Sequence, residues 1–138
     1  MLLVIDTNVV ISFLVKGKLT SLVFSPMLNL VTVERLFVEI DRNKDEIRAK
    51  SSFSAEEIEV LLTLLKGKIM PVPMEQYISF MSKAEEILGG HKKDVPFLAL
   101  ALKLNCPVWS YEKRFKRIGD IESLTTAEVR AKLDKLLL

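Results

Sequence analysis

A short apolar run near the start of the chain, residues 2–5, ends directly in an acidic residue, Asp6. An apolar run of this length without polar alternation is typical of a strand that is buried on both faces of a parallel sheet. A carboxylate at the end of such a strand loses hydration, which costs several kcal/mol unless a partner or a cation compensates its charge. The chain is therefore constrained to place an acidic group at the edge of a buried parallel sheet.

Beyond this run, patterns that predict strands alternate with patterns that predict helices. Two helix starts carry capping boxes, at Ser54 and Thr125, each with a glutamate three residues later. The alternation implies βαβ units, so we predict an α/β fold in three α/β/α layers around a mostly parallel sheet, with ligands at the carboxyl ends of the strands. Strands are expected at 28–33, 69–72, 108–110 and 121–124, and helices at 8–14, 19–24, 34–50, 55–67, 75–88, 96–104, 113–118 and from 126 onward.

The length of 138 residues predicts one domain, 1–138, and a hydrophobic content of 49% is sufficient for its core. The single cysteine, Cys106, and the single histidine, His91, exclude a disulfide framework and metal sites rich in Cys or His. A metal would need oxygen ligands, which favours Mg²⁺ or Mn²⁺. No membrane span or export signal is expected, because Asp6 and Asn8 interrupt the apolar start, and a free cysteine fits a cytoplasmic location.

Four acidic residues stand where this fold gathers functional groups. Asp6 and Glu112 follow predicted strands, Asp94 precedes a predicted helix, and Glu39 lies beside the apolar stripe of another. Each also has a structural interpretation: Asp6 and Asp94 suit helix N-caps, Glu112 suits a first helical turn, and Glu39 suits a solvated face. Together they predict a carboxylate cluster at one edge of the sheet, which repels itself unless one or two divalent cations bind.

Three stretches of the sequence, 4–12, 94–102 and 108–115, resemble the PIN-domain nuclease family, and the resemblance extends along nearly the whole chain. It implies a metal-dependent (endo)ribonuclease that acts on RNA, or less often on DNA. Asp6, Glu39 and Asp94 match the three core acids of that family. Thr7, Asn8 and Ser110 match the polar residues that support them.

The chain departs from the family pattern at the fourth acid, where Glu112 stands in place of the usual aspartate. The resemblance implies that Asp6 and Asp94 hold one Mg²⁺ or Mn²⁺, and that Glu112 joins Asp94 at a second. The longer glutamate side chain leaves open whether one metal binds or two. With Glu39, these residues are the predicted catalytic set.

Basic residues surround the acidic motif. Between residues 91 and 117 there are seven lysines and arginines and two acidic residues. Lys92 and Lys93 directly precede Asp94, and Lys113 and Arg114 directly follow Glu112. We expect these four cations to contact phosphates on either side of a cut. A solvated basic face is the structural interpretation.

Two other functions stay open at this point. A haloacid-dehalogenase-like phosphatase also begins with a strand ending in Asp, but it needs a second acid where this chain has Asn8. A catalytically weak or inactive domain of the same fold that binds RNA or protein is the stronger alternative, because Glu112 replaces the usual acid. The resemblance also implies an antitoxin-like protein partner or a housekeeping role, and a homodimer, for which the apolar helices 19–24 and 58–65 offer surface.

Overall fold

The computed structural model describes residues 1–18 and 20–137. Its centre is a five-stranded sheet in the order β3-β2-β1-β4-β5, in which every neighbouring pair is parallel. The central strand β1 pairs Leu3 with Leu30 of β2 on one side and Ile5 with Trp109 of β4 on the other. The predicted strands are confirmed. Strands β1 (Leu2–Ile5) and β3 (Ile69–Val72) have the predicted bounds, and β2 (Asn29–Val33), β4 (Val108–Trp109) and β5 (Ser123–Leu124) are shorter than predicted.

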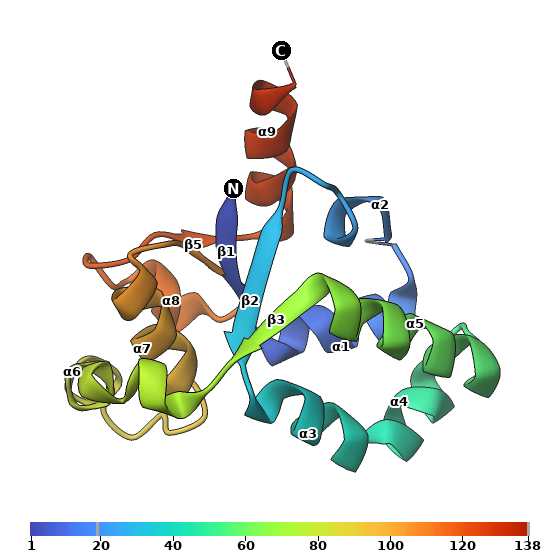
Figure 1. Cartoon of the computed structure of the whole chain (residues 1–138), viewed down its shortest axis with the longest axis horizontal. Coiled ribbons are helices and arrows are strands. Elements are labelled where there is room, and N and C mark those ends of the chain that lie inside the picture. The colour runs from blue at the N-terminus through green and yellow to red at the C-terminus, as the bar shows by residue number, and fades with distance from the viewer. Residues whose placement is uncertain (19, 138) are drawn as a thin grey trace.

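Helices cover both faces of the sheet, which confirms the predicted three-layer α/β/α architecture. Helices α1, α3, α4 and α5 lie on one side of the strands, and α6, α7 and α8 lie on the other, while α9 lies near their amino ends (Figure 1). The bounds are α1 (Thr7–Lys16), α2 (Thr20–Val23), α3 (Arg35–Arg42), α4 (Lys44–Lys50), α5 (Ala55–Lys68), α6 (Met81–Leu88), α7 (Val95–Leu104), α8 (Lys113–Lys116) and α9 (Thr126–Leu136). Leu19, where a second helix was expected to begin, lies outside the described residues.

Several predicted helices are wrong in extent. The single helix expected over 34–50 is divided at Asn43, whose backbone leaves the helical region with φ −102° and ψ 15°. There its side-chain amide donates a 2.8 Å hydrogen bond to the carbonyl of Glu39, which satisfies the end of α3. The helix expected from about residue 75 instead begins as two 3₁₀ turns, η1 (Met74–Gln76) and η2 (Ile78–Phe80), before α6. Gly67 was expected to end α5, which continues to Lys68.

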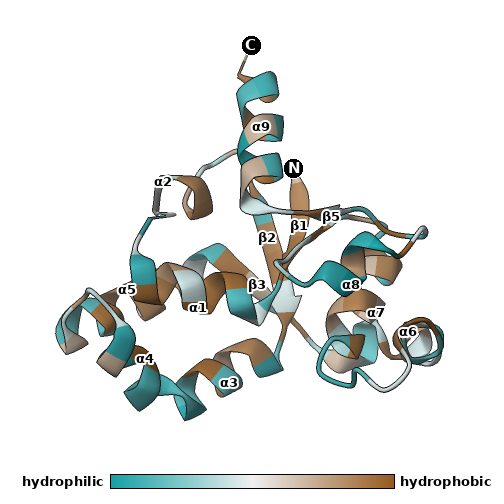
Figure 2. Cartoon of the chain, turned by 180° about the vertical axis from the view of Figure 1, so that it is seen from behind, coloured by the Kyte–Doolittle hydropathy of each residue, from teal (hydrophilic) through white to brown (hydrophobic). Residues whose placement is uncertain are grey.

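Burial follows the layering. Val4, Ile5, Val108 and Trp109 in the two central strands are fully buried, and every residue of α7 from 95 to 101 is buried beneath the sheet. Figure 2 shows the same contrast, with α7 and β1 largely hydrophobic and α4 and α9 carrying hydrophilic outer faces. In the described part of the chain, no helix combines the length and apolar character that crossing a membrane requires. The packed sheet therefore holds the carboxyl ends of β1 and β4 rigidly side by side.

Candidate active site

The strand order places a crevice at the carboxyl ends of β1 and β4. From β1 the chain winds outward to β2 and β3, and later it returns to β4 and β5 on the other side. Ligands of open parallel sheets bind where the winding direction reverses in this way. Asp6 directly follows β1 and Ser110 directly follows β4, so the strand order alone brings together two residues that are 104 positions apart.

Asp6 is the most buried acid of the site, with 4% of its surface exposed. Its carboxylate Oδ2 accepts a 2.7 Å hydrogen bond from the Ser110 hydroxyl. The N-cap interpretation is wrong for its side chain, because Asp6 occupies that position of α1 without making a side-chain capping hydrogen bond. Asp6 makes no ion pair with any described residue. It is thus a desolvated carboxylate with one strong hydrogen-bond donor.

Burial raises the pKa of the Asp6 carboxyl above its usual value of 3.8. The hydrogen bond from Ser110 opposes the increase, and the negative charge of Asp94 adds to it. The backbone amides of Asn8 and Thr7, at the start of α1, lower it slightly. Desolvation is the leading cause, so the charge of Asp6 is the part of the site that most needs a cation.

Asp94 begins α7 at the same edge of the sheet. Its backbone is helical, with φ −85° and ψ −19°, and its side chain makes no capping hydrogen bond. Instead Oδ2 accepts hydrogen bonds from Arg114, 2.9 Å from Nη2 and 3.3 Å from Nε. The capping interpretation of Asp94 is therefore also wrong for the side chain, whose partner comes from α8.

Glu112 lies beside Asp94, and Arg114 pairs with both carboxylates. Glu112 is the N-cap of α8, where its Oε1 accepts a 3.3 Å hydrogen bond from the backbone amide of Arg114. Its Oε2 lies 3.1 Å from Nη2 of the same arginine. Its own backbone amide donates a 2.9 Å hydrogen bond to the hydroxyl of Ser110. One serine hydroxyl thus links the Asp6 carboxylate to the backbone that carries Glu112.

Glu39 approaches the crevice from α3. Its Oε2 accepts a 3.2 Å hydrogen bond from the Thr7 hydroxyl, and its Oε1 lies 3.2 Å from Nη2 of Arg35, one helical turn earlier. Its side chain keeps 29% of its surface exposed. Glu39 is therefore held in place by one neighbour from α1 and one from its own helix, while it still faces solvent.

A cavity of about 600 Å³ opens between these elements. Most of the predicted site residues line it, including all four acids. Lys113 and Ser110 do not line it, although Ser110 donates a hydrogen bond to Asp6, which does. The sequence analysis missed several lining residues, of which Asn43 carried one signal, a polar residue within an otherwise continuous helical pattern. The full lining is Asp6, Thr7, Asn8, Ile11, Glu39, Asn43, Gly90, His91, Lys92, Lys93, Asp94, Phe97, Glu112 and Arg114.

The donor set suits a hard divalent cation in kind, since it consists of carboxylate oxygens around a water-accessible cavity. As the side chains lie, no three Asp, Glu, His or Cys side chains among the described residues converge closely enough to hold one ion. The guanidinium of Arg114 contacts both Asp94 and Glu112 and supplies the positive charge there. The residues therefore fit a divalent cation in their chemistry, and such a cation would compete with Arg114 for Asp94 and Glu112.

Comparisons with known proteins agree with the fold. The sequence matches the family model described as PIN domain over residues 4–134. Among solved structures, the fold is similar to the crystal structure of VapBC2 from Rickettsia felis bound to a DNA fragment from their promoter. That match has a TM-score of 0.60 at 14% sequence identity, and it covers 91% of this chain and 98% of the other. A search of curated proteins gave no match.

Proposed function

This chain belongs to the PIN domain family, whose members are generally nucleases, and on that premise we propose that it is a metal-dependent endoribonuclease that hydrolyses phosphodiester bonds in single-stranded RNA. The observation that carries the proposal is the gathering of four carboxylates on one cavity at the reversal of the sheet, with two lysines on its rim. Neither catalysis nor metal binding follows from any one of these residues alone. Their arrangement supports both.

In this proposal Asp6 and Asp94 hold Mg²⁺ or Mn²⁺, and Glu112 supplies a further ligand. A bound divalent cation lowers the pKa of water and neutralises charge that develops on the phosphate. Ser110 orients the Asp6 carboxylate through its 2.7 Å hydrogen bond. Because Asp6 has no ion-pair partner among the described residues, cation binding relieves the largest uncompensated charge of the site.

The remaining residues bind and orient the substrate. Glu39, fixed by Thr7 and Arg35, is placed to accept a hydrogen bond from the attacking water and align it with the phosphorus atom. Asn8 lines the same cavity and can donate to a phosphate oxygen. Lys92 and Lys93 are exposed on the cavity rim, where they contact phosphates without reading bases. Such contacts give binding that weakens as salt increases.

The experiment is cleavage of a single-stranded RNA of mixed sequence by the purified chain with Mn²⁺, with EDTA, and with Mn²⁺ restored. We expect cleavage that EDTA abolishes and Mn²⁺ recovers, and we expect Asp94→Asn to remove it. Lys135→Gln, which removes a positive charge from the exposed last turn of α9, is the control and should cleave like the wild type. Binding of RNA without cleavage in every condition would instead favour the alternative, a domain that binds RNA or protein without catalysis.

Two assembly proposals accompany this function. The fold is similar to that of the solved VapBC2 structure, and we propose that this chain has an antitoxin-type protein partner and forms a homodimer. On the surface, Val60 and Leu64 of α5 are more than half exposed and offer an apolar face for a second copy. Analytical ultracentrifugation of wild type and Leu64→Glu tests the dimer, since a charge at that position should shift the protein toward monomer.

A further inference from the structure

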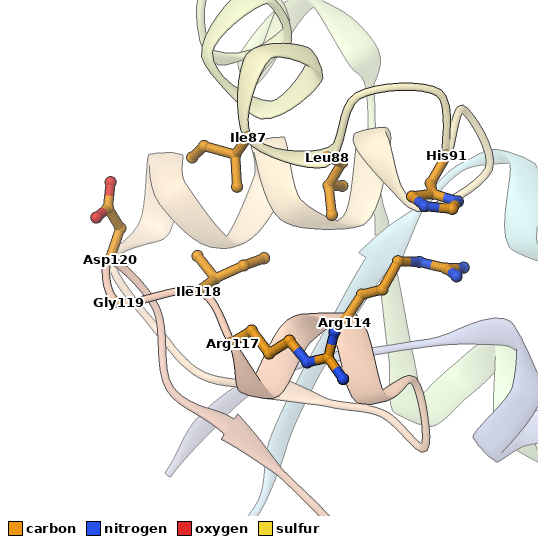
Figure 3. Close-up of a pocket in the computed structure, with 8 residues that line it drawn as sticks. All are labelled: Ile87, Leu88, His91, Arg114, Arg117, Ile118, Gly119 and Asp120. Carbon is orange, nitrogen blue, oxygen red and sulfur yellow. The ribbon is translucent and has the colours of Figure 1, made fainter.

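A second cavity, of about 380 Å³, adjoins the acidic one. His91 and Arg114 line both cavities, so the two form consecutive parts of one surface depression. Figure 3 shows His91 and Arg114 at one end of this second cavity and Asp120 at the other. A ligand that extends from the acidic cavity past Arg114 therefore enters this space next.

The wall between these ends is apolar. Ile87 and Leu88, at the end of α6, face Ile118 across the cavity (Figure 3). Ile87 leaves 37% of its surface exposed, whereas Leu88 is buried at 7%. Ile87 and Ile118, with the buried Leu88, form an apolar surface against which a flat aromatic ring can pack, so that the ring face is removed from water.

The charges that line this cavity are unequally compensated. Arg114 is paired with Asp94 and Glu112, and Asp120 is paired with Lys83 at 3.3 Å. Arg117 is exposed, and its guanidinium forms no ion pair or hydrogen bond with any described side chain. The second cavity thus presents one uncompensated cation beside an apolar wall, a combination suited to an anionic group attached to a ring.

We propose that this cavity binds the nucleotide adjacent to the cut phosphate, with its base against Ile87 and Ile118 and its phosphate on Arg117. The inference rests on the proposed nuclease function, because it requires that a nucleic-acid strand run through the acidic cavity. It adds a subsite for one nucleotide. The apolar contact accepts any base face, while the guanidinium binds the phosphate.

The first experiment measures binding separately from cleavage. Uridine 5′-monophosphate is titrated into the metal-free protein in EDTA, and amide NMR shifts are followed. We expect the Ile118 and Gly119 amides to move, and we expect Arg117→Gln to weaken binding about tenfold, as loss of a charged hydrogen-bond partner does. Ile87→Ser should weaken binding of the nucleotide several-fold and leave binding of inorganic phosphate unchanged. Shifts confined to residues of the acidic cavity would overturn the proposal.

The second experiment uses single-stranded RNA and its salt dependence. Arg117→Gln should raise the Kd for a labelled hexanucleotide in EDTA and lower the salt slope by about one. Arg130→Gln, on the exposed face of α9, removes the same charge far from the site and should change neither. Equal effects of Arg117→Gln and Arg130→Gln would refute the subsite. If the wild type still cleaved RNA in that case, the nuclease proposal would stand without it. Nucleotide binding with the expected shifts but no cleavage with Mn²⁺ would instead refute the nuclease and retain the subsite.

Discussion

The two walls of the acidic cavity hold their carboxylates in opposite ways. Asp6, at the end of the central strand, is 4% exposed and has a serine hydroxyl as its partner. Asp94 and Glu112, at the starts of two helices, keep 15% and 23% of their side chains exposed and share one guanidinium. The first wall therefore has a buried carboxylate without a counter-ion. The second has two more exposed carboxylates that share the Arg114 guanidinium as their counter-ion.

This difference separates two ways in which a protein tolerates clustered acids. Desolvation raises the pKa of Asp6, because burial makes its charged form less stable than it is in water. Across the cavity, Arg114 compensates charge directly and keeps Asp94 and Glu112 within reach of one another. A divalent cation acts differently on each wall, since it neutralises Asp6 and competes with Arg114.

The largest expected effect comes from removing one charge on each wall. Asp6→Asn and Asp94→Asn should each lower RNA cleavage by about 10³-fold, roughly 4 kcal/mol, because each removes a ligand of the proposed cation. Both should also lose the increase in Tm that saturating Mn²⁺ gives the wild type. Cleavage rates at several Mn²⁺ concentrations and thermal melts provide the measurements. Full activity in either variant would contradict its assignment as a ligand.

Ser110 connects the two walls, so its removal should affect both. Ser110→Ala deletes the donor to Asp6 and the acceptor of the Glu112 amide, and we expect it to cost about 1–3 kcal/mol of unfolding free energy in urea. The matched control is Ser123→Ala. Ser123 is also buried, on the neighbouring strand β5, but its hydroxyl has no hydrogen-bond partner among the described residues. That variant should be neutral or slightly stabilising, and equal losses would refute the linking role of Ser110.

Replacing Arg114 tests the compensated wall. Arg114→Gln removes the competing cation, so Asp94 and Glu112 should bind Mn²⁺ about tenfold more tightly, a gain of about 1.4 kcal/mol. In the absence of metal the same variant should be less stable than the wild type, because two neighbouring carboxylates are left unpaired. Isothermal titration with Mn²⁺ measures the first effect and urea unfolding the second. Lys113→Gln removes one positive charge at the adjacent position and breaks no ion pair with Asp94 or Glu112. An identical gain in Mn²⁺ affinity in that variant would assign the effect to net charge alone.

The smallest expected effect is a pH dependence that belongs to Asp6. Its pKa is raised in the folded protein, so protonation favours the folded state. Without metal, its contribution to stability should therefore fall as pH rises from its usual pKa of 3.8 through the raised value. Urea unfolding of wild type and Asp6→Asn in EDTA, compared across that range, isolates this contribution. A stability difference between the two that stays constant with pH would contradict it.

Much of the architecture was predictable because local patterns agreed with the tertiary packing. The apolar run before Asp6, the capping boxes at Ser54 and Thr125, and the strand–helix alternation all predicted elements that the structure contains. The failures have local causes. Asn43 ends a helix by bonding back to the Glu39 carbonyl, and residues 74–80 form 3₁₀ turns where a helix was expected. Local hydrogen bonds of this kind leave the spacing of the apolar residues unchanged, so that spacing does not predict them.

The candidate site was predictable in its members and less so in its contacts. All four acids and both Lys92 and Lys93 line one cavity, and that convergence follows from parallel strands ending at a common edge. The pairing of Arg114 with Asp94 and Glu112 did not follow, since a basic residue beside an acidic motif fits a phosphate contact equally well.

The sequence by itself determined that a buried strand would end in a carboxylate and that helices would cover a parallel sheet, because burial and periodicity are properties of neighbouring residues. Only the tertiary structure decided which charges meet. Asp6 and Ser110 lie 104 residues apart, and Arg114 reaches Asp94 across 20 residues. Electrostatic partners are chosen by distance in space, and that distance exists only after the strands have taken their order in the sheet.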